Sequence, residues 1–342
     1  HMVSFIFRRL LALPLVMFAV SIIIVGLLQL LSPTQRAGSY IRSEAQARNI
    51  DVIVKQYGLD QPFPVQYGIW LREVLSGNLG FSRTSSEPVA TTIRKRLPAS
   101  AELAIFAFIP IVWFGIAMGT AAALNRDKLI DQVSRVLAIV GWSLPTFVFG
   151  IWILVIFYGG YGLFGIGRVS NEFIEQIARG NIRTPTGFMT IDALLNGRFD
   201  LFLNTLQHLV LPVTTLVVVI CAQIMRVMRG SLIEALSQDY VRTARAKGLP
   251  ERTVNLKHAR RNALIPIVTL SGLVLAGLIS GTVVVETIFN FDGLGGWFAR
   301  AAGQLDTPAV LGFALLVAFI ITVANLVVDI LYAFVDPRIR YD

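Results

Sequence analysis

The chain alternates between long runs of apolar residues and shorter polar segments. A helix needs about 20 mostly apolar residues to cross a membrane, and six runs reach that length. We therefore expect transmembrane helices at about residues 10–31, 101–124, 136–158, 209–228, 264–285 and 309–334. The predicted fold class is all-α, a polytopic membrane helix bundle over residues 3–342, with residues 1–2 a cloning remnant.

The composition favours the same class. Of the 342 residues, 55% are hydrophobic and only 15% are charged, whereas soluble domains carry roughly 25% charged residues. The mean hydropathy is +0.67. The net charge of +9 fits either a nucleic-acid-binding protein or a membrane protein with basic loops on one side. Because the basic residues gather in short segments between apolar runs, we expect no nucleic-acid partner.

Basic residues mark one alternating set of connecting segments. These are Arg8, Arg9, Arg126, Lys128, Arg135, Arg226, Arg229, Arg242, Arg245, Lys247, Arg252, Lys257, Arg260, Arg261, Arg338 and Arg340. Short basic loops stay in the cytoplasm, so we expect both termini and the loop 229–263 to be cytoplasmic. The longer segments 33–100 and 159–208 then lie outside. In the first of these, Asp51–Tyr57 and Pro64–Leu75 have the apolar spacing of helices.

The loop 229–263 is polar and basic, yet patterned. Its apolar residues fall on one helix face: Leu232, Leu236, Tyr240 and Ala244. This spacing predicts one rigid helix from Ser231 to Lys247, ended by Gly248. Pro250 and Glu251 suit the first turn of a second helix. The loop is therefore expected to form a helix, a sharp turn and another helix.

Two uses of this element are open from its periodicity. It could rest on anionic lipid, because it is positively charged, or it could dock into a groove of a partner protein. The small residues Ala244, Ala246 and Gly248 would let a partner backbone approach closely.

The stretch DYVRTARAKGLPERTVNLKHARRNALIP, residues 239–266, resembles the EAA loop of ABC importer permeases. Its form is most similar to the first permease subunit type of the dipeptide/oligopeptide group. Ala244 and Gly248 match the Ala and Gly of the motif, whereas Arg242 and Thr243 replace its Glu and first Ala. The resemblance implies a coupling helix that sits in a cleft of an ATPase subunit. It assigns this role to Asp239, Tyr240, Arg242, Thr243, Ala244, Arg245, Ala246, Lys247, Gly248 and Leu249.

Further segments resemble the same group in order along the chain. They are YGLDQPFPVQYGIWL (57–71), GNLGFS (77–82), SLPTFVFGIWIL (143–154), HLVLP (208–212), VVVETIFNFDGLGGW (283–297) and DPRIR (336–340). The segment 168–198 fits the group least and is expected to be an insertion.

The resemblance implies a non-catalytic subunit in the bacterial inner membrane. Its implied partners are a homologous second permease, two ABC ATPase subunits that carry ATP and Mg, an extracytoplasmic peptide-binding protein and membrane lipid. No P-loop motif G-x-x-x-x-G-K-[ST] occurs in the sequence, and we expect this chain itself to bind no cofactor or metal. The implied substrate is a di- or oligopeptide. Nickel complexes, glutathione and a stand-alone secondary transporter remain alternatives.

A few polar residues within the apolar runs are candidates for a gate or path. Glu286 ends the fifth run, and at a helix end it can reach water; Asn325 and Asp329 lie one turn apart in the sixth. For all three, a structural contact is the competing interpretation. Pro145 is expected to kink the third run. Cys221 stands alone, so it forms no internal disulfide.

Overall fold

The computed structural model describes residues 2–41, 49–280 and 282–335, and most of these are helical. The first part contains α1 (Met2–Leu27), η1 (Leu28–Leu30), α2 (Pro33–Ala37), η2 (Gly38–Tyr40), α4 (Ile50–Gln56), α5 (Phe63–Leu75), β1 (Phe81–Ser82), β2 (Glu87–Pro88) and α6 (Val89–Leu124). The middle contains α7 (Leu129–Ser143), α8 (Thr146–Ile153), the π-helical η3 (Leu154–Gly160), α9 (Asn171–Ala178), α10 (Met189–Leu195) and α11 (Phe199–Ser237). The last part contains α12 (Asp239–Ala246), α13 (Glu251–Thr253), the π-helical η4 (Val254–Ala259), α14 (Arg260–Ala263), α15 (Ile265–Ile279), α16 (Val283–Ile288), α17 (Leu294–Gly303) and α18 (Thr307–Val335).

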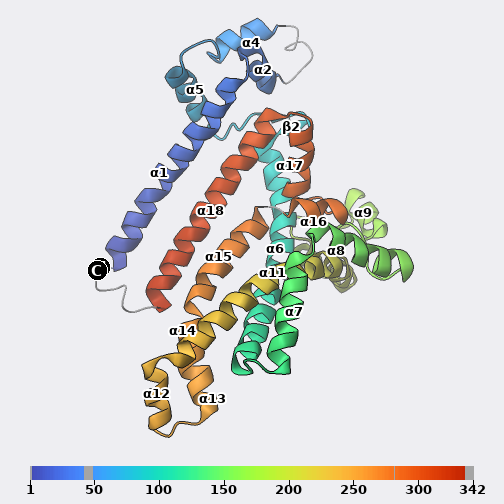
Figure 1. Ribbon diagram of the computed structural model, residues 1–342. Coiled ribbons are helices and arrows are strands. Elements are labelled where there is room, and N and C mark those ends of the chain that lie inside the picture. Colours follow the sequence, from blue (N-terminus) through green and yellow to red (C-terminus); the bar gives the residue numbers. More distant parts are fainter. Residues whose placement is uncertain (1, 42–48, 281, 336–342) are drawn as a thin grey trace.

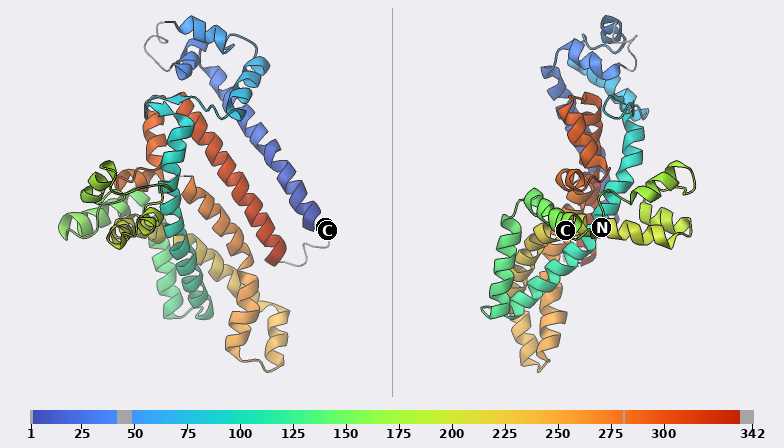
Figure 2. Two further views of the ribbon diagram at one scale, coloured as in Figure 1. Left: turned by 180° about the vertical axis from the view of Figure 1, so that it is seen from behind. Right: turned by 90° about the vertical axis from the view of Figure 1, so that its right-hand side faces the viewer.

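Two small helical assemblies lie at opposite ends of the molecule (Figures 1 and 2). The cap consists of α2, η2, α4 and α5 and lies at the end of α1. The arm consists of α12, α13, η4 and α14 and follows α11. Between them, α18 packs against both α1 and α15, and α6 packs against α11. A third assembly, the side segment (residues 161–198), contains α9 and α10 and projects sideways from the bundle.

Five helical stretches are long and apolar enough to cross a membrane. They are Leu13–Leu30, Val89–Leu124, Phe199–Ser237, Ile265–Ile288 and Thr307–Val328, and α7 with α8 and η3 makes a sixth if the bent pair counts as one span. The described residues form one small sheet, in which β1 pairs with β2 in antiparallel fashion. The prediction of an all-α polytopic membrane bundle is therefore confirmed.

The third apolar run contains a sharp bend rather than one continuous helix. The two helical parts, Leu129–Ser143 and Thr146–Gly160, meet at an angle of 99°. Leu144, between them, is extended, with φ −75° and ψ 121°. Because the ring of Pro145 clashes with a helical conformation at the preceding residue, the helix ends there. The kink expected at Pro145 is thus present and large.

Glycines set the close approach of α6 to α11. A Cβ atom on Gly119 would lie 2.7 Å from both the carbonyl oxygen of Met225 and Cβ of Met228. A Cβ atom on Gly115 would lie 2.7 Å from Cβ of Ile224. In a membrane, moving an apolar side chain from lipid into a helix interface gives no hydrophobic stabilisation. Helices there associate through close packing, which small residues such as glycine allow. These two helices form the centre of the bundle.

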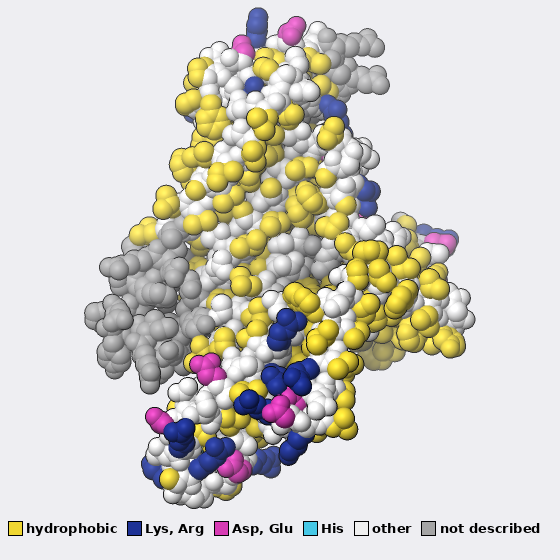
Figure 3. All heavy atoms as spheres, in the orientation of Figure 1, with side chains coloured by type: hydrophobic (Ala, Val, Ile, Leu, Met, Phe, Trp, Pro, Cys, Tyr) yellow, Lys and Arg dark blue, Asp and Glu magenta, His cyan; other side chains and the backbone are white. Residues whose placement is uncertain are grey.

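Much of the apolar surface faces outward. Large side chains such as Trp113, Ile139 and Val155 are more than 60% exposed. Figure 3 shows hydrophobic side chains over the middle of the molecule, whereas Lys and Arg gather at the arm. A soluble monomer rarely exposes so large an apolar area, so this band is suited to lipid or to a partner subunit.

Candidate functional site

The arm begins where α11 ends, and the chain breaks there. Gln238 is extended, with φ −75° and ψ 153°, so it separates α11 from α12. The predicted single helix from Ser231 to Lys247 is therefore wrong. The apolar residues from Leu232 to Ala244 keep helical spacing throughout. Such a pattern cannot reveal a single residue with a non-helical ψ, which is why the break at Gln238 was not predicted. α12 is instead a separate helix.

One face of α12 packs within the arm. Val241 is fully buried and Ala244 is 7% exposed, and both belong to the same apolar cluster as Val254 and Ala259 of η4. Leu232 and Ala235 of α11 belong to the same cluster. Ala244 is thus not available to a partner backbone, contrary to the expectation from its small size. Ala246 and Gly248 are exposed.

The turn after α12 depends on a glycine. Gly248 has φ +74°, a conformation that L side chains adopt only with strain. Its N–H donates to the carbonyl of Arg245 at 2.9 Å, and the N–H of Leu249 reaches that of Ala244 at 3.4 Å. No atom lies within 4 Å of a Cβ built on Gly248. The requirement for glycine is therefore conformational and not steric, and the predicted glycine end of this helix is present one residue past Lys247.

An ion pair braces the two sides of the turn. Arg245 donates from Nε and Nη2 to the two carboxylate oxygens of Glu251, at 2.8 and 3.3 Å. Arg242 pairs with Asp239 at 3.3 Å, but both side chains are at least 75% exposed, so this pair adds little. The remaining polar surface is available to a partner. It comprises Asp239, Tyr240, Arg242, Thr243, Ala246, Lys247, Gly248 and Leu249.

The structure contains a buried ion pair near the arm that the sequence pattern did not predict. Arg229 of α11 donates from Nε and Nη2 to the two oxygens of Asp131 in α7, at 2.6 and 2.8 Å. The N–H of Asp127 donates to the same carboxylate at 3.0 Å. The Asp131 side chain is 0% exposed and that of Arg229 is 21% exposed. The sequence feature that could have indicated this pair is Asp131 itself, an acidic residue among the basic residues Arg126, Lys128 and Arg135.

Glu286, at the end of the fifth apolar run, is buried. It is 1% exposed, and its carboxylate accepts hydrogen bonds from Ser100 Oγ at 2.7 Å and from the N–H of Gly296 at 2.9 Å. The same Ser100 Oγ accepts from the N–H of Leu294 at 2.8 Å. Glu286 therefore ties α16 to α6 and to the start of α17. This geometry favours the structural interpretation of Glu286 over an exposed gate contact.

A second buried carboxylate anchors the side segment. Glu102 of α6 is 1% exposed and pairs with Arg168 at 2.6 Å. It also accepts hydrogen bonds from the N–H and the hydroxyl of Thr190, both at 2.7 Å. Within the side segment, Asp192 accepts from Thr186 and from the N–H of Gly187. The region that least resembles the family pattern is thus held firmly on α6.

The other two path candidates lie on α18. Asn325 is exposed and lines an apolar groove between α1 and α18, together with Val16 and Val20. Asp329 follows one turn later on the same helix, and its side chain lies outside the described residues. Glu286, by contrast, is bonded to Ser100 of α6 and to Gly296 of α17. The described residues contain no group of three or more His, Cys, Asp or Glu side chains that could hold a metal ion.

Comparison with known proteins covers nearly the whole chain. Residues 111–341 match the binding-protein-dependent transport system inner membrane component family, and residues 2–104 match the N-terminal part of such membrane components. A probable D,D-dipeptide transport system permease protein of Escherichia coli is 40% identical over 290 residues, 85% of this chain and 84% of the relative. A dipeptide permease of Alkalihalophilus pseudofirmus is 34% identical over 99% of this chain and 100% of the relative. A glutathione permease of Salmonella choleraesuis is 35% identical over the same shares.

The matched family explains the features built up above. An apolar bundle of five or six spans, with a basic helical arm at one end, is what a transport permease needs to sit in a membrane and to contact other subunits. The chain belongs to the family of binding-protein-dependent transport system inner membrane components, and it is a multi-pass protein of the bacterial inner membrane.

Proposed function

We propose that this chain is a permease subunit of an ATP-driven ABC importer that carries di- or oligopeptides. The relatives named for dipeptide transport support the peptide class, and the glutathione permease supports it too, since glutathione is itself a tripeptide. The chain would form half of the translocation path, and a homologous second permease would supply the other half. A peptide-binding protein would deliver the substrate from outside, as the name of the family suggests.

The arm is the part of the chain that we propose to couple ATP hydrolysis to transport. α12 presents an exposed polar face that includes Arg242 and Arg245, while Val241 and Ala244 fix it to η4 and α11. A short helix held in this way can move as a unit and pass its motion to α11 and α15, which flank the arm. We infer that α12 docks into a cleft of an ABC ATPase subunit. ATP and Mg would bind to two such subunits and not to this chain.

The same proposal sets the topology. The arm and both termini would lie in the cytoplasm, and the cap and side segment outside. The clustering of Lys and Arg on the arm supports this orientation. A single-cysteine label at Ser237, beside the arm, should react with a membrane-impermeant thiol reagent only after the cells are opened, whereas a label at Asp60 on the cap should react in intact cells. The reverse pattern would overturn the orientation.

The docking proposal is tested by Ala246→Trp. Ala246 is exposed, so the bulky side chain leaves the packing of the arm intact but blocks close approach of a partner. We expect the variant chain to insert normally but to lose co-purification with the ATPase subunits and peptide-dependent ATP hydrolysis. Asp60→Trp, at an exposed position between α4 and α5 of the cap, is the control and should behave as the wild type. Normal assembly of Ala246→Trp would count against docking through α12.

The competing function is a secondary transporter that works alone. Reconstitution separates the two. The purified chain in liposomes should transport no peptide without its partners, and transport should appear when the second permease, the ATPases, the binding protein and ATP are supplied. Uptake by the chain alone would refute the proposed function.

A further inference from the structure

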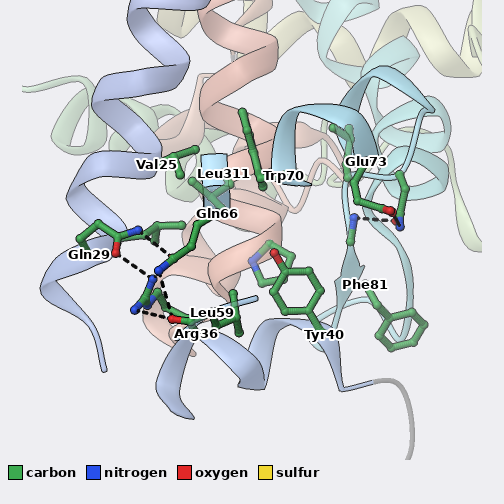
Figure 4. A pocket seen from close by; sticks show the side chains of 15 residues that line it. Val25, Gln29, Arg36, Tyr40, Leu59, Gln66, Trp70, Glu73, Phe81 and Leu311 are labelled. Atoms are coloured by element: carbon green, nitrogen blue, oxygen red, sulfur yellow. Dashed lines mark hydrogen bonds between the residues drawn. The ribbon is translucent and has the colours of Figure 1, made fainter. Parts of the chain in front are cut away.

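A small cavity lies where the cap meets the ends of α1 and α18 (Figure 4). It has about 60 Å³ of room for water-sized molecules. At about 10–15 Å³ per water, this is space for about four to six waters or for one small organic group. Its lining includes Gln29 of η1, Pro308 and Leu311 of α18, and polar and aromatic side chains of the cap.

A buried cation faces this cavity. Arg36 is only 8% exposed. Its Nη1 donates to the side-chain oxygens of Gln29, at 2.9 Å, and of Gln66, and its Nη2 donates to the carbonyl of Leu59 at 3.2 Å. Its Nε is buried and has no hydrogen-bond partner among the described residues. Within the described residues these neutral oxygens satisfy N–H groups and no carboxylate balances the positive charge of Arg36. A guanidinium binds carboxylates strongly.

An anion lines the same cavity. Glu73 is the acidic residue in the lining, and one of its oxygens, Oε2, accepts from Asn78 Nδ2 at 2.6 Å. Within the part of the chain that the structure describes, no ion pair joins Glu73 to Arg36. Figure 4 shows Tyr40 between the two in this view. Burial chiefly raises the pKa of Tyr40 to about 12; the neighbouring Tyr57 and the carboxylate of Glu73 add to this effect, and the charge of Arg36 opposes it.

We propose that this cavity binds a small zwitterion of the amino acid class, with its carboxylate on Arg36 and its ammonium group on Glu73. The two charges would then each gain an opposite partner, and the rings of Tyr40, Trp70 and Phe81 would enclose the carbon atoms of the ligand. The site goes beyond the proposed transport function and does not rest on it, because it needs neither the arm nor an ATPase.

The test is calorimetric titration of the purified full-length chain with glycine and with diglycine. Sodium acetate and glycinamide are the one-ended probes, since each carries only one of the two charges. We expect saturable binding of at least one zwitterion, and binding of each one-ended probe that is weaker by about tenfold or more, as the loss of a charged hydrogen-bonded contact implies. Absence of saturable binding by both zwitterions would overturn the proposal.

Variants assign the site. Arg36→Gln and Glu73→Gln should each weaken zwitterion binding by about tenfold or more. Arg72→Gln and Asp60→Asn remove the same charges from exposed positions on or beside the cap and should leave binding unchanged. If Arg36→Gln does not fold, Arg36→Lys keeps the charge without the planar fork and should still weaken binding. Unchanged binding in both Arg36→Lys and Glu73→Gln would refute the assignment.

A lipid head group with a phosphate and an ammonium group is the competing occupant. Phosphatidylethanolamine added to the delipidated chain should not displace glycine if the proposal holds. Displacement of glycine by this lipid, but not by phosphatidylglycerol, would overturn it in favour of a lipid site.

Discussion

The ion pair between Asp131 and Arg229 should contribute strongly to the stability of the chain. Loss of one partner of a buried pair costs about 3–5 kcal/mol, because the other charge stays buried without compensation. Here the guanidinium of Arg229 is 21% exposed and the carboxylate of Asp131 is 0% exposed. Arg229→Met therefore leaves the fully covered carboxylate with only the N–H of Asp127 and a distant Arg135 at 4.0 Å. We expect a loss of about 2–4 kcal/mol, the lower end reflecting the partial exposure.

The opposite variant should cost less. Asp131→Asn keeps an oxygen that can accept from Arg229, and the guanidinium can turn toward water, so we expect about 1–2 kcal/mol. Arg135→Met is the control, because its side chain is 49% exposed and should matter by less than about 0.5 kcal/mol. The free energy of unfolding would be measured by titrating the purified chain with SDS in mixed micelles and following tryptophan fluorescence. If Arg229→Met is no more destabilising than Arg135→Met, the pair does not hold α7 to α11 as argued.

Three further variants test other parts of the fold. Gly248→Ala should lower the stability of the arm by about 1–2 kcal/mol because of the positive φ, measured as faster hydrogen exchange over residues 239–263; unchanged exchange would contradict the argument. Gly119→Val should cost about 1–3 kcal/mol by forcing α6 from Met225, whereas Gly26→Val, with no atom within 4 Å, should be neutral in the same SDS titration. The raised pKa of Tyr40, about 12, means that its contribution to stability is present below pH 10 and is lost as the pH rises toward 12. Tyr40→Phe should therefore reduce the loss of stability between pH 9 and 11, and an identical loss would refute the assignment.

The features that the sequence predicts well are those encoded locally. A membrane-spanning run is a property of about 20 adjacent residues, so its presence can be read without knowing what packs against it. The turn at Gly248 after α12 and the bend at Pro145 are likewise local, because each depends on the conformational limits of one residue. The break at Gln238 has no such signal, since glutamine is compatible with a helix.

The features that could not be predicted depend on distant partners. Glu286 is buried because Ser100, 186 residues earlier, supplies a hydroxyl. Glu102 holds the side segment through Arg168, 66 residues later. Ala244 looks like a surface residue until Val254 and Ala259 fold back over it. In each case the local pattern allows both exposure and burial, and tertiary packing decides between them.

The length of α11 has a mechanical consequence. Its 39 residues form a rod of about 58 Å at 1.5 Å per residue. The side segment joins one end of this rod and the arm joins the other. If the rod pivots about its midpoint by about 10°, each end travels about 5 Å, in opposite directions, as the geometry of such a helix requires. A modest displacement of the arm can therefore become a comparable displacement of the side segment without any change in the packing within either one.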